Sequence, residues 1–261
     1  MNMEGASVDK PTAVNAHSSR DEAYWAKPVR TLDVTAVPAD AVNTNVAGRR
    51  VAGAAQGFGQ LWHKRFRVRL DGAPVSPREV VRIWKERFGD FWPKLARMYM
   101  PATGIAPGEI GIINAGIPGT PTFATGVLVI YADDVSFSFI TPEGHPFTGP
   151  ITFSAFDDEG TTVAQVDEFT RASDPLWELL MILPFVGNKM QTAQWIATLG
   201  NLAAHWGVAA DVEVEVVCLD RSRQWSQAKN IWHNAGIHSS LYAAGAPFRR
   251  LARPNAKRRK P

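Results

Sequence analysis

Apolar and charged residues alternate in LWHKRFRVRL, residues 61–70, which predicts a strand with one buried face. The segment SPREVVRIWKERFGDFW follows after a DGAP turn. It opens with Ser76 as N-cap, Pro77 at the first helical position and Glu79 three residues after the cap, and its apolar residues then recur at spacings of three and four. We expect an amphipathic helix that ends at Pro93.

Short apolar segments divided by Gly, Pro and Asp turn signals fill the middle of the chain. Successive strands with short turns form an antiparallel meander. The expected strands span residues 109–114, 122–132, 135–141, 149–157 and 161–172.

A long apolar pattern of helical period covers residues 174–206, with Pro184 and Gly187 expected to kink it. One more alternating strand, DVEVEVVCLD, and a last amphipathic helix follow. These elements divide the chain into a flexible arm that partly docks (1–56), a central domain (57–207), a strand–helix extension (208–246) and a disordered basic tail (247–261).

Charge is uneven along the chain. The net charge is +3, yet seven Lys and Arg residues gather in the last 13 residues with no acid among them. The basic tail favours contact with an anionic surface, either acidic lipid or nucleic acid, or serves solubility alone. No aromatic residues interleave with these charges, and no specific nucleic-acid motif accompanies them.

Composition is that of an ordinary globular protein, with 45% hydrophobic and 20% charged residues. The longest apolar run, at 179–186, is too short to span a membrane, and the first residues lack a signal-peptide pattern. Cys218 is the single cysteine, which excludes an intrachain disulfide. We therefore expect a cytoplasmic protein that is not an integral membrane protein.

The order of strand, helix, antiparallel meander and long helix resembles the helix-grip fold of the START-like, or SRPBCC (Bet v 1-like), superfamily. More narrowly, GHPFTG (144–149), ITFSAF (151–156) and DEFTRASDPL (167–176) resemble an uncharacterised bacterial family, a domain of unknown function with a G-H-P-x-x-G motif. The likeness covers residues 60–207. It implies an α+β fold in which a curved antiparallel sheet wraps the long helix and leaves a cavity, but it implies no reaction. The strand and helix at 211–246 depart from the pattern, and we expect them to cover an open sheet edge.

His145 is the first candidate for chemistry, because an imidazole titrates near neutral pH. It either acts as a general acid or base, contacts a ligand, or shapes the entry to a strand with its ring bonded to a backbone carbonyl. Gln165 and Asp167 lie on one face of a strand whose two faces both mix polar and apolar residues. They either orient an apolar ligand or belong to a solvated edge strand.

Large aromatic residues on the two expected helices and on the sheet suit the walls of a ligand cavity, with core packing as the alternative. No histidine pair has metal-ligand spacing, the common nucleotide and hydrolase motifs are absent, and we expect no metal and no cofactor. The candidate ligand-binding residues are His145, Gln165, Asp167, Phe137, Phe139, Trp84, Trp177, Met181 and Trp195.

Three functions remain open from the sequence. The first is binding of a hydrophobic small molecule, such as a lipid, polyketide or isoprenoid, between the sheet and the 174–206 helix. The second is a cyclase or dehydratase that uses the same cavity, with His145, Gln165 and Asp167 as its polar groups. The third is an interaction protein whose cavity is filled by its own side chains and whose last helix and tail dock a partner.

Overall fold

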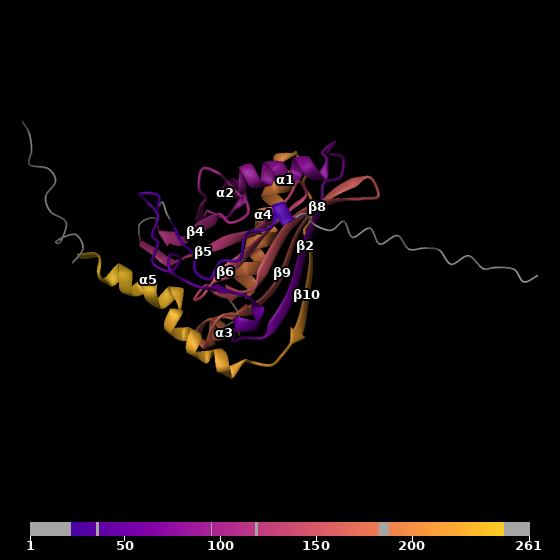
Figure 1. The fold of residues 1–261 in the computed structure, drawn as a ribbon. Helices are drawn as coiled ribbons and strands as arrows, with labels where there is room; N and C mark the ends of the chain where they lie inside the picture. Colours follow the sequence, from indigo (N-terminus) through magenta and orange to yellow (C-terminus); the bar gives the residue numbers. More distant parts are fainter. Residues whose placement is uncertain (1–21, 35–36, 95, 118–119, 183–187, 248–261) are drawn as a thin grey trace, which may run out of the picture.

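A large antiparallel sheet forms the body of the protein (Figure 1). The structure is a computed structural model that describes residues 22–34, 37–94, 96–117, 120–182 and 188–247. Its strand order is β10-β2-β9-β8-β6-β5-β4-β3, with β1 paired to β6 and β7 paired to β9.

The strands and helices have the following bounds. The strands are β1 (Val51–Ala52), β2 (Leu61–Arg69), β3 (Ala96–Tyr99), β4 (Ile110–Ile117), β5 (Thr120–Ala132), β6 (Ser136–Pro142), β7 (Phe147–Thr148), β8 (Pro150–Asp158), β9 (Thr161–Ala172) and β10 (Glu213–Asp220). The α-helices are α1 (Pro77–Glu86), α2 (Phe88–Phe91), α3 (Pro175–Ile182), α4 (Asn188–His205) and α5 (Ala235–Ala244), and the 3-10 helices are η1 (Glu22–Tyr24), η2 (Ala54–Gln56) and η3 (Trp225–His233).

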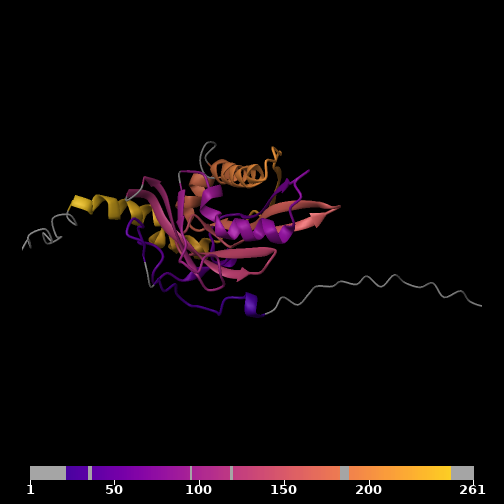
Figure 2. The ribbon, with the colours of Figure 1, turned by 90° about the horizontal axis from the view of Figure 1, so that it is seen from above.

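The architecture is the α+β helix-grip fold expected from the element order. The first long strand, β2, pairs with the last strand of the meander, β9, so the sheet curves around α1 and α4. Figure 2 shows α4 on one side of the sheet and the described N-terminal segment on the other. We call the face toward α1 and α4 the concave face, and the opposite face convex.

The appended elements lie where the sheet would otherwise end. Strand β10 pairs with the free edge of β2, from Glu213 opposite Arg67 to Asp220 opposite Leu61. Helix α5 packs against β5, where the Ala124 amide donates to Ser239 Oγ. The extension therefore covers the β2 edge, as the sequence predicted.

Two elements differ from the sequence expectations. Strand β3 was not expected, because its four residues are too few to show a period of two. The last helix consists of η3 followed by α5, and the Asn234 side chain starts α5 by accepting a hydrogen bond from the Ile237 amide at 3.0 Å. The expected kink at Pro184 and Gly187 lies outside the described residues.

Aromatic side chains fill the concave interior between α1, α2 and the central strands. Phe137 and Phe153 stack with ring centroids 4.8 Å apart, and the Trp84 ring meets the Phe153 ring edge-on at 5.3 Å. Phe88 and Phe139 complete the cluster, in which all five side chains are at most 3% exposed. Burial of such rings stabilises the fold by roughly 1.5–3 kcal/mol each.

The described part of the N-terminal segment packs on the convex face. Leu32 and Val46 are 2% and 0% exposed and pack with Leu128 in a second apolar cluster. The Asn114 side chain exchanges two hydrogen bonds with the Val42 backbone, at 2.8 and 2.9 Å. Residues 22–34 and 37–56 are thus held mainly by side-chain and backbone contacts to the sheet, which leave no periodic pattern in the sequence.

Within the part of the chain that the structure describes, we find no helix with both the length and the apolar character needed to cross a membrane.

Candidate functional site

A buried polar cluster lies on the concave face, among apolar side chains. Lys64 on β2 stands directly opposite Glu168 on β9, and the two residues are 2% and 1% exposed. Gln191 reaches them from α4: it accepts a hydrogen bond from Lys64 Nζ and donates one to Glu168 Oε2 at 3.0 Å. Lys64 Nζ lies 3.5 Å from Glu168 Oε1. The cluster therefore joins the sheet to the long helix.

Burial shifts the two charged groups of this cluster in opposite directions. Desolvation raises the pKa of Glu168 and lowers the pKa of Lys64, while the attraction between the two groups offsets part of each shift. Both shifts favour the neutral forms. Shifted pKa values of this kind are common at functional sites.

Several buried polar atoms on the same face form no hydrogen bond with described residues. They are Thr125 Oγ1 and the indole nitrogen of Trp177, with the indole nitrogens of Trp84 and Trp92 in the aromatic region. Glu168 Oε1 and the Trp195 indole also lack a short hydrogen bond, but Lys64 Nζ lies 3.5 Å from Glu168 Oε1 and the indole is near enough to the carboxyl to lower its pKa. An unsatisfied buried polar group costs about 1–3 kcal/mol, so such groups usually have a partner, either ordered water or a bound molecule. A partner here needs acceptors for the indole N–H groups and a donor for the carboxylate.

The expected aromatic walls divide into two sets. Trp84, Phe137 and Phe139 belong to the packed aromatic cluster. Trp195 lies at the border of that cluster, 5.5 Å from the Phe153 ring, and lowers the pKa of Glu168. The polar cluster and its aromatic border thus share one surface.

The two expected helix residues on α3 are only partly buried. Trp177 meets Phe123 at 6.0 Å, and Phe123 is two positions before Thr125 on the same face of β5. Met181 lies one turn further along α3 and is also partly exposed. Of the two, only Trp177 contributes an unpaired polar atom.

Gln165 and Asp167 lie on the convex face, because β9 alternates and Ala164, Val166 and Glu168 are its buried side. The carbonyl oxygen of the Gln165 side chain accepts a hydrogen bond from Arg67 Nε at 2.8 Å. Asp167 pairs with His63 Nε2 at 2.6 Å. The structure therefore separates these two residues from α4 and from the polar cluster.

His145 is held by its own turn. Its Nδ1 lies 2.8 Å from the Phe147 carbonyl oxygen and 3.1 Å from the Phe147 amide nitrogen. Burial lowers the pKa of His145 to about 4, so the ring is neutral at pH 7. The ring of Phe147 lies 5.6 Å from Lys64 Nζ, so the GHPFTG segment borders the polar cluster without joining His145 to Gln165 or Asp167.

Sequence reasoning missed Lys64 and Glu168, although a signal was present. Lys64 occupies a position in LWHKRFRVRL where the alternation calls for an apolar residue, since Phe66 and Val68 follow it at intervals of two. Glu168 follows Val166 in the same way on β9. A charged residue in the buried register of a strand marks either an error in register or a functional group.

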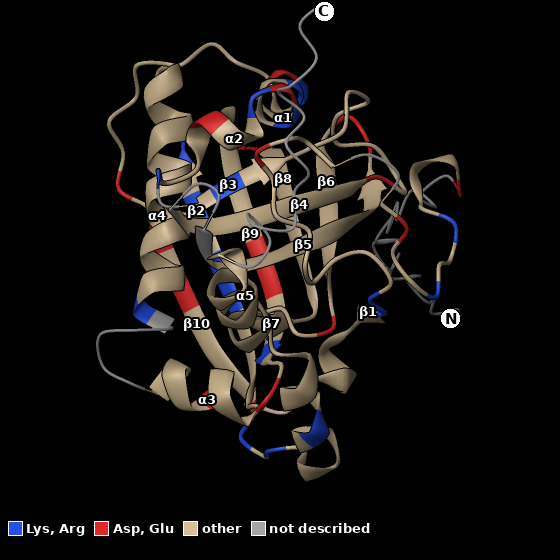
Figure 3. Cartoon of the chain, turned by 90° about the vertical axis from the view of Figure 1, so that its left-hand side faces the viewer, with Lys and Arg blue, Asp and Glu red and all other residues tan. Residues whose placement is uncertain are grey.

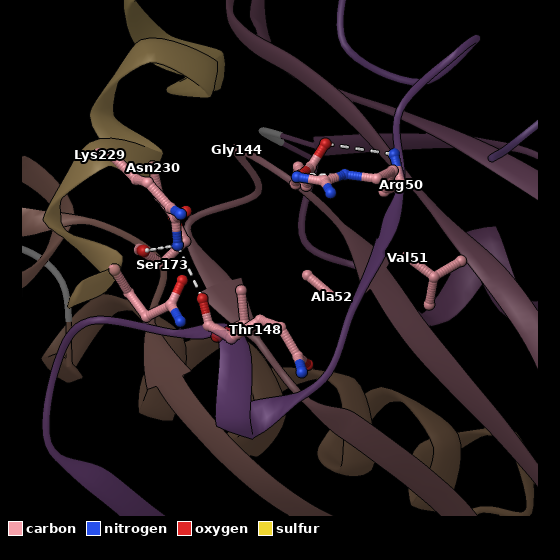
Figure 4. Close-up of a pocket in the computed structure, with 11 residues that line it drawn as sticks. Arg50, Val51, Ala52, Gly144, Thr148, Ser173, Lys229 and Asn230 are labelled. Carbon is pink, nitrogen blue, oxygen red and sulfur yellow. Dashed lines mark hydrogen bonds and ion pairs between the residues drawn. The ribbon is translucent and has the colours of Figure 1, made fainter. Parts of the chain in front are cut away.

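A separate polar pocket of about 360 Å³ lies between β1, the β6–β7 turn and η3 (Figure 4). Arg50 pairs with Glu143 on one side, and the Asn230 side chain donates to the Ser173 carbonyl at 2.9 Å on the other. The Ala235 amide donates to the Gly144 carbonyl at 2.9 Å, which ties α5 to the turn. The described residues contain no group of three His, Cys, Asp or Glu side chains placed to bind a metal ion.

No family model matches the chain, and no curated protein matches it. Solved structures similar to it include the di-domain ARO/CYC StfQ from the steffimycin biosynthetic pathway, with 12% identity and a TM-score of 0.41 over 56% of this chain and 50% of that one. Ara h 8.0201 has 12% identity and a TM-score of 0.40 over 56% of this chain and 97% of its own. The major latex-like protein 151 from Panax ginseng has 10% identity and a TM-score of 0.38 over 57% and 100%. The chain thus spans half the length of the di-domain protein.

Proposed function

We propose that the chain binds a hydrophobic small molecule bearing a hydroxyl or carbonyl group between the concave face and the α3–α4 helices. The observation that carries this proposal is the set of buried polar atoms that lack a short hydrogen bond: Thr125 Oγ1, the Trp177 indole and, apart from their contacts with Lys64 and with each other, Glu168 Oε1 and the Trp195 indole. Small-molecule sites are mostly apolar with a few polar groups, and these atoms lie among apolar side chains.

Each group has a distinct role in this proposal. The indole N–H groups of Trp195 and Trp177 donate to a carbonyl or ether oxygen, and Glu168 Oε1 accepts from a hydroxyl. Lys64 and Gln191 fix the orientation of Glu168 through the hydrogen bonds described above. Lipids, polyketides and isoprenoids are the ligand classes that combine such oxygens with a large apolar surface.

The proposal is tested first by native mass spectrometry of freshly purified full-length protein, which should reveal a co-purifying molecule. Binding is then followed with the hydrophobic fluorescent probe anilinonaphthalene sulfonate, displaced by a panel of hydroxylated polyketides, isoprenoid alcohols and fatty acids. We expect one class to displace the probe.

Variants of one strand provide a matched control. Glu168→Gln removes the carboxylate charge and keeps nearly the same shape, and Trp195→Phe removes the indole N–H together with part of the ring, so the Kd of the best ligand should rise about tenfold, or roughly 1.4 kcal/mol, or more for Trp195→Phe. Asp167→Asn, one residue from Glu168 but on the opposite face, should leave the Kd unchanged. A protein that purifies empty and binds no member of the panel contradicts the proposal.

A second function, an enzyme of cyclase or dehydratase type, is favoured by the raised pKa of Glu168 beside a lysine of lowered pKa. In this alternative Glu168 exchanges a proton with the bound molecule, a role that the sequence assigned to His145, Gln165 and Asp167. Glu168→Gln should then abolish product formation while the Kd changes little. Equal product formation by the wild type and this variant would exclude it.

The GHPFTG segment at 144–149 supports one further proposal, membership of the uncharacterised bacterial family with that motif. Its likeness concerns the turn and the strand entry, and it adds no reaction to the function proposed above.

A further inference from the structure

The segment formed by η3 and α5 exposes several large apolar side chains. Trp225 and Trp232 are 74% and 79% exposed, and Leu241 and Ile237 are 66% and 38% exposed. Single exposed apolar residues are ordinary, but four within 17 consecutive residues of one segment form an interaction surface. We call this surface the η3–α5 face.

Helix α5 presents apolar side chains on its outward side, next to the exposed Ser240. Ala235 and Ser239 are 0% and 1% exposed and point to the sheet, where Ser239 Oγ accepts a hydrogen bond from the Ala124 amide at 2.8 Å. Ile237 and Leu241, four residues apart, form the outward side. Figure 3 shows no charged residue along α5. The outward side of α5 thus exposes Ile237 and Leu241 without a described element over them.

The charge of the same region favours one kind of partner. Residues 221–261 contain ten Lys and Arg residues and no Asp or Glu, and seven of the ten follow the described residues at 249–260. Arg223 pairs with Glu178 of α3 at 3.0 Å, whereas Lys229, between the two tryptophans in the sequence, is exposed. Exposed tryptophan and leucine next to excess positive charge is the pattern of a segment that lies in the interface of an anionic membrane.

Two other occupants fit less well. A second copy of the chain would bring two segments of this all-positive composition together, and their repulsion opposes pairing. Single-stranded nucleic acid could stack its bases on Trp225 and Trp232, but the aliphatic side chains of Ile237 and Leu241 offer it no stacking surface.

We propose that the η3–α5 face docks on the surface of an anionic lipid membrane, with its tryptophans at the level of the headgroups and its basic residues against the acidic lipids. Each basic residue near such a surface adds an electrostatic attraction that weakens as the salt concentration rises. Burial of the apolar side chains in the lipid adds binding free energy that salt does not weaken. The attachment is peripheral and reversible. It gives a carrier of a hydrophobic molecule direct access to lipid.

The test uses full-length protein and sedimentation with vesicles of phosphatidylcholine alone or mixed with phosphatidylserine. We expect binding to the mixed vesicles, weaker binding at high salt, and little binding to phosphatidylcholine. The double variant Trp232→Ser/Leu241→Ser should lower the partition coefficient on mixed vesicles about tenfold, because it removes two exposed apolar side chains.

The control is Val216→Ser/Leu219→Ser on β10, which removes two partly exposed apolar side chains, 45% and 51% exposed, outside the face. Circular dichroism checks that both double variants remain folded. The proposal is overturned if mixed vesicles do not bind the protein at low salt, or if both double variants bind as the wild type does. It is also overturned if the protein binds single-stranded DNA more tightly than the vesicles and Trp232→Ser/Leu241→Ser abolishes that binding.

Discussion

Removal of the Lys64 ammonium should reveal how the buried cluster contributes to stability. In Lys64→Met, the Glu168 carboxylate remains buried, its nearest cation is gone, and the loss of that cation raises its pKa further. The double variant Lys64→Met/Glu168→Leu removes both charges and fills the space with apolar atoms. The two variants therefore separate the cost of an isolated charge from the value of the pair.

The expected magnitudes follow from the burial of both groups. Breaking a buried ion pair on one side costs about 3–5 kcal/mol, whereas replacing the whole pair by apolar residues is close to neutral. A carboxyl group whose folded-state pKa lies above its unfolded value stabilises the fold fully below the unfolded pKa, and this contribution is lost as pH rises through the folded pKa. Lys64→Met should therefore lose stability with rising pH, by up to about 1.4 kcal/mol per pH unit from Glu168.

Urea unfolding of the wild type and the two variants, at several pH values between about 5 and 8, measures this directly through the midpoints and m values. Lys64→Met should unfold at lower urea as pH rises, and the double variant should follow the wild type. If Lys64→Met shows the same pH dependence as the wild type, or if the double variant is as unstable as Lys64→Met, the carboxylate is not the buried charge that we describe.

Three other changes have expected outcomes. Burial lowers the pKa of His145 from 6.5 to about 4, so its neutral form stabilises the fold above pH 6.5 by at most about 3 kcal/mol. This stabilisation is lost as pH falls from 6.5 to about 4, and His145→Asn should therefore show a weaker loss of stability over that pH range. Asn114→Ala leaves the Val42 backbone N–H and carbonyl unpaired, so the free energy of unfolding, measured with urea, should fall by about 2–4 kcal/mol. A fall of less than about 1 kcal/mol would mean that these bonds do not hold the N-terminal segment. Gly144 has φ +84° and no room for a Cβ beside the His233 carbonyl. Gly144→Ala should therefore lower the free energy of unfolding by more than about 2 kcal/mol, and an unchanged melting temperature would refute that packing.

The sequence predicted the parts of the fold whose apolar period is long and regular. The structure places three such elements within a few residues of their expected bounds: β2 with nine residues, β9 with twelve, and α1 with its Ser76 cap. The N-terminal segment was not predictable in this way, because single contacts such as Asn114 with Val42 hold it, and long-range pairs leave no local pattern.

The candidate site was predicted in part. The strand carrying Gln165 and Asp167 was recognised, but only the packing of Val166 in the core decides that Glu168 shares the concave face while its neighbours face outward. Lys64 could have been found as a break in the alternation of β2. Nothing in the sequence pairs it with Glu168, because the two are 104 positions apart and meet only through strand register.

The β6–β7 turn at Gly144 is where the two ends of the described chain meet. Arg50 from the N-terminal side pairs with Glu143, and the amide of Ala235 from the C-terminal side bonds to Gly144. During synthesis the turn is therefore complete about ninety residues before its last partner leaves the ribosome. Docking of α5 on the turn is a late step in folding, and the amide of Ala235 should exchange its hydrogen with solvent sooner than the amides that join β2 to β9.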